Sequence, residues 1–248
     1  ARVPFEQPAR DARVERLASV LEVIYLIFNE GYSATAGDDW MRPALCDEAL
    51  RLGRILAGLV GDDSEVHGLV ALMEIQASRM HARTDDEGRP VLLLEQDRTR
   101  WDALLIRRGL AALARSAALG GARGPYALQA EIAACHARAQ RAEATDWVQI
   151  VALYDALAQV APSPVVELNR AVAVGMAFGA QAGLELVDAL AAEPALAGYR
   201  WLPSVRGDLL AKVGRIEEAA TEFERAAAMT SNARERELLL GRARTCRE

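Results

Sequence analysis

A helical repeat pattern in residues 201–231 restricts the fold more than any other feature of the sequence. Small residues recur there at the spacing of a tetratricopeptide repeat (TPR), in which two antiparallel helices cross closely and a phenylalanine fills the space between them. Trp201 lies near the early tryptophan of such repeats. The small and apolar positions are Gly207, Leu210, Gly214, Ala219, Phe223 and Ala226. Arrays of such helix pairs commonly present a concave binding face.

A weaker copy of this pattern lies upstream, at Ala171, Val174, Gly183, Val187 and Leu190. Elsewhere, apolar residues recur with a helical period, and the residues between them are mostly strong helix formers such as Arg and Glu. We therefore predict an all-α protein, built as a multi-helix array of antiparallel helix pairs. Its C-terminal half is expected to be TPR-like, with at most one small β-hairpin near residues 82–96.

Longer helices are expected in the N-terminal half, over residues 11–29, 43–60, 62–81 and 97–119. They follow an extended arm over residues 1–12. The segment GGARGP at 120–125 is the clearest linker in the chain. We therefore predict an N-terminal helical domain over residues 1–120 and a TPR-like repeat domain over residues 121–248.

Several helix starts are marked by capping residues. Asp62 or Asp63 is expected to cap the third helix, with Glu65 as its capping-box partner. Asn232 and Glu235 have the same relationship at the start of the last helix. Three further helix starts are expected along the chain. Pro125 opens the first, Thr145 or Asp146 caps the second, and Ser163 caps the third with Pro164 as its first helical residue.

Composition limits the classes of protein that fit. The 248 residues are 52% hydrophobic, which allows a sizeable core, yet no apolar run approaches the roughly 18 residues of a membrane helix. No signal peptide is recognisable, and a start at Ala1 suggests a piece of a longer protein. A net charge of −6 argues against a non-specific phosphate-binding surface, which would normally be basic. Three widely spaced cysteines, Cys46, Cys135 and Cys246, favour a reducing cytoplasm.

The stretch from Tyr25 to Gly37 joins an apolar helical run to a polar turn. Its polar residues Glu30 and Tyr32 either hold the loop or line a site, and the structural interpretation is favoured. A buried carboxylate without a partner is costly, so Glu30 is expected to be exposed or hydrogen-bonded to loop backbone. In the alternative, Tyr25, Phe28, Tyr32 and Trp40 line a pocket under the 30–42 loop.

Two further polar clusters allow a structural or a functional interpretation. Residues 95–102, EQDRTRWD, include Asp97, Arg98 and Trp101. They are expected to form a helix N-terminus, and the alternative is a charged rim around a partner groove. Asn169 and Arg170 are expected to form a hydrogen-bonded bracket between repeats, with partner contact as the alternative.

Recognisable catalytic and metal motifs are missing from the sequence. The three histidines, His67, His81 and His136, do not have metal-ligand spacing, and there is no HExxH, GxSxG, P-loop or GxGxxG string. We therefore expect neither an enzyme nor a bound cofactor or metal.

Seven longer strings occur in one order along the chain: YLIFNEGYSA (25–34), LCDEALRL (45–52), EVHGLVALM (65–73), EQDRTRWD (95–102), GPYALQAEIAA (124–134), TDWVQIVALYDAL (145–157) and PSPVVELNRAVAV (162–174). Together they resemble the C-terminal extension of a subgroup of extracytoplasmic-function (ECF) RNA polymerase sigma factors, those with a TPR-like C-terminal domain. The resemblance extends from about Val3 to Arg244.

That resemblance implies a regulatory module needed for sigma activity. Region 2 and region 4 of such factors, which bind polymerase and read promoter DNA, would precede this chain in the same polypeptide. The implied partners are these two regions, the RNA polymerase core and a small YCII-like protein, with promoter DNA contacted only through the missing regions and no membrane involved. The alternative is a small-molecule sensor or vestigial enzyme domain with a pocket near residues 25–42.

Overall fold

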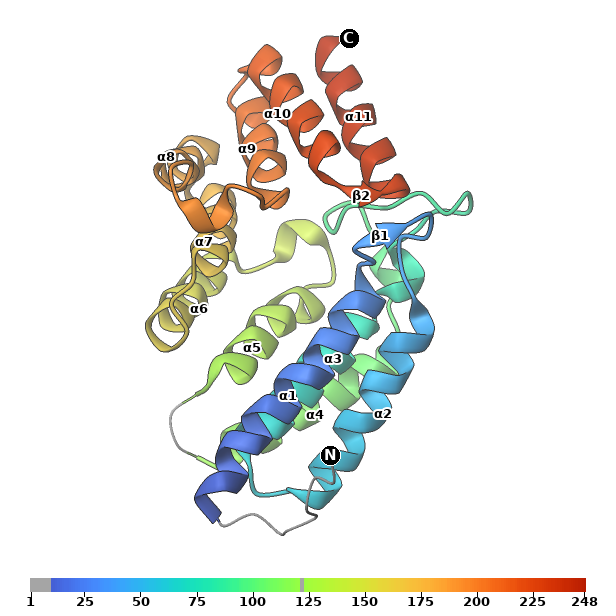
Figure 1. The fold of residues 1–248 in the computed structure, drawn as a ribbon, viewed down its shortest axis with the longest axis vertical. Helices are drawn as coiled ribbons and strands as arrows, with labels where there is room; N and C mark the ends of the chain where they lie inside the picture. Colours follow the sequence, from blue (N-terminus) through green and yellow to red (C-terminus); the bar gives the residue numbers. More distant parts are fainter. Residues whose placement is uncertain (1–9, 121–122) are drawn as a thin grey trace, which may run out of the picture.

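The computed structural model describes residues 10–120 and 123–248, with side chains from Arg16 onward. Nearly all of the regular structure is helical, which confirms the all-α prediction (Figure 1). The α-helices are α1 (Arg10–Tyr32), α2 (Pro43–Leu59), α3 (Ser64–Ala77), α4 (Ala103–Ala118), α5 (Pro125–Arg138), α6 (Trp147–Val160), α7 (Pro164–Phe178), α8 (Ala180–Leu190), α9 (Trp201–Lys212), α10 (Ile216–Met229) and α11 (Ala233–Arg247).

Most helices pack on their neighbours in the chain, and α5 packs mainly on α3. The core is therefore a series of adjoining clusters. The first joins α1, α2 and α3 around Phe28 and Leu69. The next two join α3, α4 and α5, and then α5, α6 and α7. The last and largest joins α7 to α11 around Phe223 and Leu210. Figure 1 shows the resulting curved array.

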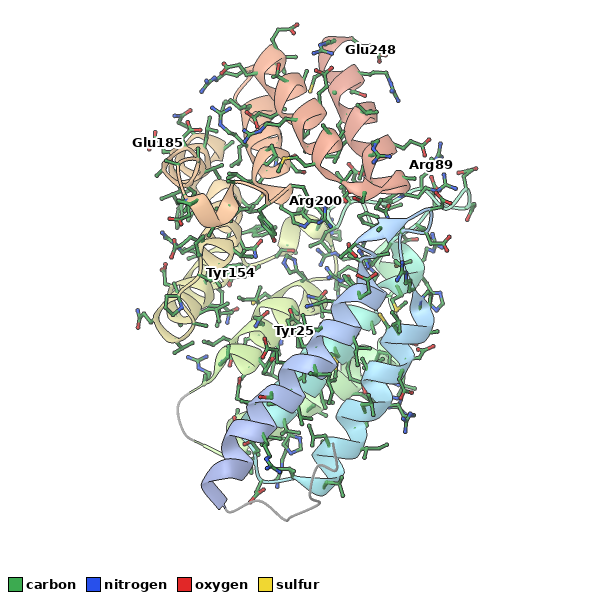
Figure 2. All side chains as sticks on the ribbon, viewed as in Figure 1. Tyr25, Arg89, Tyr154, Glu185, Arg200 and Glu248 are labelled. Atoms are coloured by element: carbon green, nitrogen blue, oxygen red, sulfur yellow. The ribbon has the colours of Figure 1, made fainter. Side chains whose placement is uncertain are left out.

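The helix after the predicted linker belongs to a shared core. Residues 121–122 of that linker lie outside the described residues. α5 packs against α3, with Ala130 and Ala134 meeting Leu72 and Ile75. Tyr25 on α1 also donates a hydrogen bond of 3.0 Å to Gln129 on α5, and Figure 2 shows Tyr25 at this contact. The division into domains 1–120 and 121–248 stays a prediction, as does the extended arm, most of which lies outside the described residues.

Capping residues start most helices where they were expected. Ser163 caps α7, Asp146 caps α6 and Asn232 caps α11 through side-chain oxygens that accept backbone N–H groups. Asp63 caps α3, but the capping-box roles expected of Glu65 and Glu235 are wrong. The Glu235 carboxylate pairs with Arg200, and the Asn232 backbone nitrogen donates to the Thr230 hydroxyl. The Glu65 carboxylate instead accepts hydrogen bonds from the backbone nitrogens of Tyr126 (2.8 Å) and Ala127 (3.1 Å) at the start of α5.

The helix expected from residue 97 begins later. Asp97 caps only a 3₁₀ turn, η2 (Arg98–Arg100), and Trp101 after it has extended backbone angles. A second aspartate, Asp102, then caps α4 by accepting from the nitrogens of Leu104 and Leu105. Two cap residues five apart thus divide the expected helix into a short turn and α4.

TPR-like packing is present in the C-terminal half. A Cβ atom built on Gly207 of α9 would lie 2.9 Å from the Phe223 ring and 3.2 Å from the Ala219 carbonyl of α10. In the upstream copy, a Cβ on Gly183 of α8 would lie 2.8 Å from the Ala171 carbonyl of α7. Glycine at these crossings lets the helix backbones approach closely, as the spacing predicts.

Two short strands join distant parts of the chain, a feature that was not predicted. β1 (Ala36–Gly37) pairs in parallel with β2 (Ser231–Asn232), which lies just before α11 (Figure 1). The hairpin expected near 82–96 is reduced to one antiparallel bridge between Thr84 and Pro90. Among the described residues, every helix is too short or too polar to cross a membrane.

Candidate functional site

The loop after α1 is held by its own side chains. The Glu30 carboxylate accepts from the Thr35 backbone nitrogen at 3.2 Å and forms an ion pair of 2.9 Å with Arg42. Arg42 also donates to the Ala36 carbonyl at 3.1 Å. The expectation that Glu30 bonds to loop backbone is confirmed. Its interactions fix the strand β1 in position to meet β2.

Asn232 fastens this loop to the last helix. Its side-chain nitrogen donates to the carbonyls of Ala34 (3.3 Å) and Asp39 (2.8 Å), while its side-chain oxygen accepts from the Glu235 backbone nitrogen (3.1 Å). The residue is 0% exposed. One side chain therefore caps α11 and closes the array at the same time. We call these contacts, together with the β1–β2 pairing, the clasp.

Behind the clasp lies a buried ion pair. Glu235 accepts from the Arg200 side chain at 2.8 Å and also from the Thr230 hydroxyl. Figure 2 places Arg200 at the junction between α9–α11 and the lower helices. Because Glu235 is buried and Arg200 only partly exposed, the pair holds α9 and α11 in a fixed relation beside the clasp.

Arginine and aromatic side chains from separate segments meet below the clasp. The Arg83 guanidinium lies 3.5 Å from the centre of the Tyr32 ring and 5.5 Å from that of Trp40. Arg83 also donates to the Tyr32 backbone carbonyl. On α1, Phe28 stacks on Tyr32 at 5.6 Å. Arg83 is only 7% exposed, and this burial lowers the pKa of its guanidinium.

The assembly continues through two more arginines. Arg79 lies 5.7 Å from the Tyr32 ring centre and 5.8 Å from that of Trp101, and Arg98 lies 4.9 Å from Trp101. Such cation–π contacts each contribute about 0.5–2 kcal/mol, more where water is excluded. We call the six residues the arginine–aromatic stack: Trp40, Arg83, Tyr32, Arg79, Trp101 and Arg98.

Arg98 joins the stack to α5. It donates to the carbonyls of His136 (2.6 Å) and Ala139 (2.7 Å) and to the Thr145 hydroxyl (3.1 Å). These carbonyls belong to the C-terminal end of α5, where a cation is favoured. Burial, together with Arg79 and Arg98, lowers the pKa of His136 to about 4. Arg98 in the 95–102 segment therefore has a structural role, and the alternative of a charged rim around a partner groove stays a prediction.

A groove of about 1000 Å³ runs along the C-terminal half. One wall is the loop after Arg89, including Leu92 to Leu94, and the other wall comes from α9 and α11. Most of its lining is apolar and includes Trp147, Trp201 and Leu238. Since Trp147 packs on His136 with ring centres 5.2 Å apart, the groove and the stack share one supporting framework.

The groove walls carry different charges. On the α9–α11 wall, Lys212 and Arg242 both pair with Asp208, and further arginines line the same side. On the opposite wall, Arg89 pairs with Asp85 at 2.6 Å, and Glu95 is exposed. Figure 2 shows Arg89 beside the lower end of α11. The basic wall faces a more acidic one across an apolar floor.

The remaining predicted residues lie apart from the groove lining. Asp97 is exposed and accepts from the Thr99 backbone nitrogen at 2.9 Å. Arg170 pairs with Glu167 (2.8 Å) on its own helix and with Asp155 (3.4 Å) on α6. Among the described residues, only Arg170 of the expected Asn169–Arg170 bracket therefore links two helices. Asn169 is exposed on α7. A partner role for these residues stays a prediction.

Neither of the two described cavities is lined by residues 25–42. Phe28 is 1% exposed in the core, Tyr25 packs edge-on against Tyr126, and Tyr32 and Trp40 belong to the stack. The aromatic side chains expected to surround a pocket are thus used in packing. Within the described part of the chain, no group of three or more His, Cys, Asp or Glu side chains could hold a metal ion.

Comparisons with known proteins give relatives without an assigned function. Residues 16–117 match the model of a family of unknown function, DUF6596. The chain is 48% identical over 236 residues to an uncharacterized protein of Rhizobium meliloti (strain 1021). That match covers 95% of this chain and 55% of the relative, so the chain spans about half the relative's length. No solved structure matches.

The family match and the longer match cover different parts of the site. Residues 16–117 contain the complete arginine–aromatic stack and one groove wall, whereas α9 and α11 lie beyond them. The relative's match extends over 95% of the chain and therefore reaches the groove as well.

Sequence analysis missed Arg79, Arg83 and the groove-lining leucines. Arg79 and Arg83 are ordinary helix-surface residues by pattern, and only the fold brings them to Tyr32. The leucine run at 92–94 lies in the segment where a small hairpin was expected, and its position opposite α11 was not predicted. Asn232 was predicted as a helix cap, but its hydrogen bond to the Asp39 carbonyl was not predicted.

Proposed function

We propose that this chain is the regulatory C-terminal domain of an ECF-type RNA polymerase sigma factor, and that it controls sigma activity through protein contacts in transcription initiation. The observation that carries the proposal is the groove, which combines an apolar floor with walls of different charge. The ordered strings from YLIFNEGYSA to PSPVVELNRAVAV support the family assignment. The relative's additional length leaves room for polymerase-binding and promoter-binding regions.

In this proposal the groove receives a segment of sigma region 2 or region 4 of the same polypeptide, or of the RNA polymerase core. A small YCII-like protein is a further partner, and the setting is the cytoplasm. A volume of about 1000 Å³ is at the upper end for small-molecule pockets, which favours several side chains of a protein segment over one metabolite. Promoter DNA is contacted only through the other regions, in keeping with a net charge of −6.

Two neighbouring leucines on α11 provide a matched test. Leu238 lines the groove, whereas Leu240 is outside its lining and is 37% exposed. In the complete polypeptide, Leu238→Glu should reduce transcription from a target-promoter reporter by about tenfold, because an apolar anchor is replaced by a charge. Leu240→Glu should leave it near the wild-type level.

Thermal melting of both variants checks that the fold is kept. Equal transcription by the wild type and a folded Leu238→Glu variant would argue against the groove as the contact surface.

A further inference from the structure

Two arginines of the stack form a like-charge pair that the protein does not neutralise. Arg79 follows α3, and Arg83 follows the 3₁₀ turn η1 (Met80–Ala82), so they are four residues apart on a helical path. Both residues have right-handed helical backbone angles. Like charges at this spacing destabilise a helix, because their side chains lie on the same face. Both guanidinium groups are also directed to the ring of Tyr32.

Carboxylates near this pair are engaged elsewhere. Glu30 is bound to Arg42 and to loop backbone, and Glu74 is bound to Arg54 at 2.7 Å. Among the side chains that the structure describes, no carboxylate forms an ion pair with Arg79 or Arg83. Outside the stack, the described arginines without such a partner are all exposed. Among the described residues, a buried or half-buried arginine without a carboxylate partner therefore occurs only in the stack. A partly buried charge without a counter-charge is costly.

The two guanidinium groups keep unused donors. Arg83 donates only through Nη1, to the Tyr32 carbonyl, and Arg79 donates only through Nη2, to the Gln76 side chain. The Nε of Arg79 is buried without a partner. The Nε and Nη2 of Arg83 and the Nη1 of Arg79 have no hydrogen-bond partner among the described residues. Both residues therefore keep donors that a ligand could use.

Arg98 differs in this respect and helps define the site. Its Nη1 and Nη2 donate to two carbonyls and a hydroxyl of the protein. It therefore holds α5 and Trp101 in place, and three of its four terminal N–H groups are used within the protein. Arg98 also lacks a carboxylate partner, but its charge is stabilised by the carbonyls at the end of α5. Among the described residues, Arg79 and Arg83 together make one bond to a backbone carbonyl, that of Tyr32, and they carry two positive charges.

We propose that Arg79 and Arg83 bind a phosphate-class dianion at the Tyr32 end of the stack. A dianion balances the two positive charges, and the planar guanidinium fork matches the oxygen spacing of phosphate. Phe28 occupies one face of Tyr32, so the ring holds Arg83 on the other face and restricts its rotation. This site is separate from the groove and does not depend on the proposed sigma-factor role.

Calorimetric titration of the chain with inorganic phosphate, against sodium chloride at equal ionic strength, tests the site. We expect saturable binding of phosphate. Arg79→Gln and Arg83→Gln should each weaken it by at least about tenfold, because each removes a charge-assisted contact. The matched control is Arg51→Gln, since Arg51 is exposed and pairs with Glu48 at 2.6 Å. It should bind phosphate like the wild type.

A parallel titration with glycerol 3-phosphate distinguishes two sources of the same group. Tighter binding of the monoester identifies a phosphate carried by a larger molecule, and tighter binding of inorganic phosphate identifies the free ion. Arg79→Gln is the more conservative variant, because Arg79 is less buried than Arg83. Absence of saturable binding by the folded wild type, or equal binding by a folded Arg79→Gln variant, would overturn the proposal.

Discussion

Asn232 makes the contacts that join the first and last parts of the array. Its nitrogen bonds two carbonyls of the 34–39 loop, and its oxygen caps α11. Asn232→Ser keeps a good N-cap residue but removes both donors to the loop. Because this site is fully buried, we expect unfolding free energy to fall by about 1–3 kcal/mol in urea titrations.

The matched control is Ser163→Ala, which removes an N-cap on α7 away from the clasp and should cost about 1 kcal/mol. A loss for Asn232→Ser of only a few tenths of a kcal/mol would show that the loop contacts contribute little.

His136 makes stability depend on pH. Burial first, and then Arg79 and Arg98, lower its pKa from 6.5 to about 4 in the folded chain. Between these pH values the unfolded state binds a proton at His136 that the folded state does not bind. The contribution of His136 to the free energy of unfolding is therefore complete above pH ~6.5 and declines as pH falls toward ~4. Between pH 7 and pH 5 the His136 contribution should fall by roughly 1–2 kcal/mol.

Urea unfolding at both pH values checks this expectation. His136→Gln should reduce the difference between pH 7 and pH 5, whereas His81→Gln, at an exposed site, should leave it unchanged. An unaltered pH dependence in His136→Gln would show that other groups are responsible.

At the scale of the helical elements, the close crossing of α9 and α10 depends on Gly207, because glycine has no side chain. A Cβ at Gly207 would lie 2.9 Å from the Phe223 ring, which is buried and cannot move away freely. Gly207→Ala should therefore destabilise the chain by about 1–3 kcal/mol. Gly241→Ala on α11 is the matched control, because its Cβ would have no contact closer than 3.9 Å.

The control should stabilise the chain by up to about 1 kcal/mol, since alanine favours a helix over glycine. Thermal unfolding of both variants makes the comparison. Similar effects for the two substitutions would contradict a close crossing at Gly207.

Local rules predicted the helices better than the connections between them. The caps at Ser163, Asp146 and Asn232 and the small residues of the repeat depend on short spacings, which a sequence displays directly. Glu65 shows where this fails: its spacing suited a capping box, but the fold offered the N-terminus of α5 instead. A carboxylate can accept hydrogen bonds from the N–H groups of either helix start. Which of them it binds depends on the tertiary structure, which the local spacing does not show.

At the scale of the whole molecule, the array is organised by contacts between residues far apart in sequence. β1 and β2 come from opposite ends of the described chain, and each is only two residues long. Such short strands carry no periodicity, so the clasp could not be predicted. The same holds for the stack, where residues between Tyr32 and Trp101 meet only after α1 and α3 pack together.

This arrangement places the segment from Arg79 to Trp101 between the two halves of the molecule. Its arginines contact the aromatic rings of the first half, and its leucines line the groove of the second half. The same segment therefore contributes to both the arginine–aromatic stack and the groove.

Transcription from a target promoter by the complete polypeptide, with and without residues 16–248, tests the central claim most directly. A reporter assay in cells, with equal protein levels confirmed by blotting, compares the two forms. The account predicts a large loss of transcription without residues 16–248, because these residues are proposed to be needed for sigma activity. Transcription at the level of the complete polypeptide would contradict it.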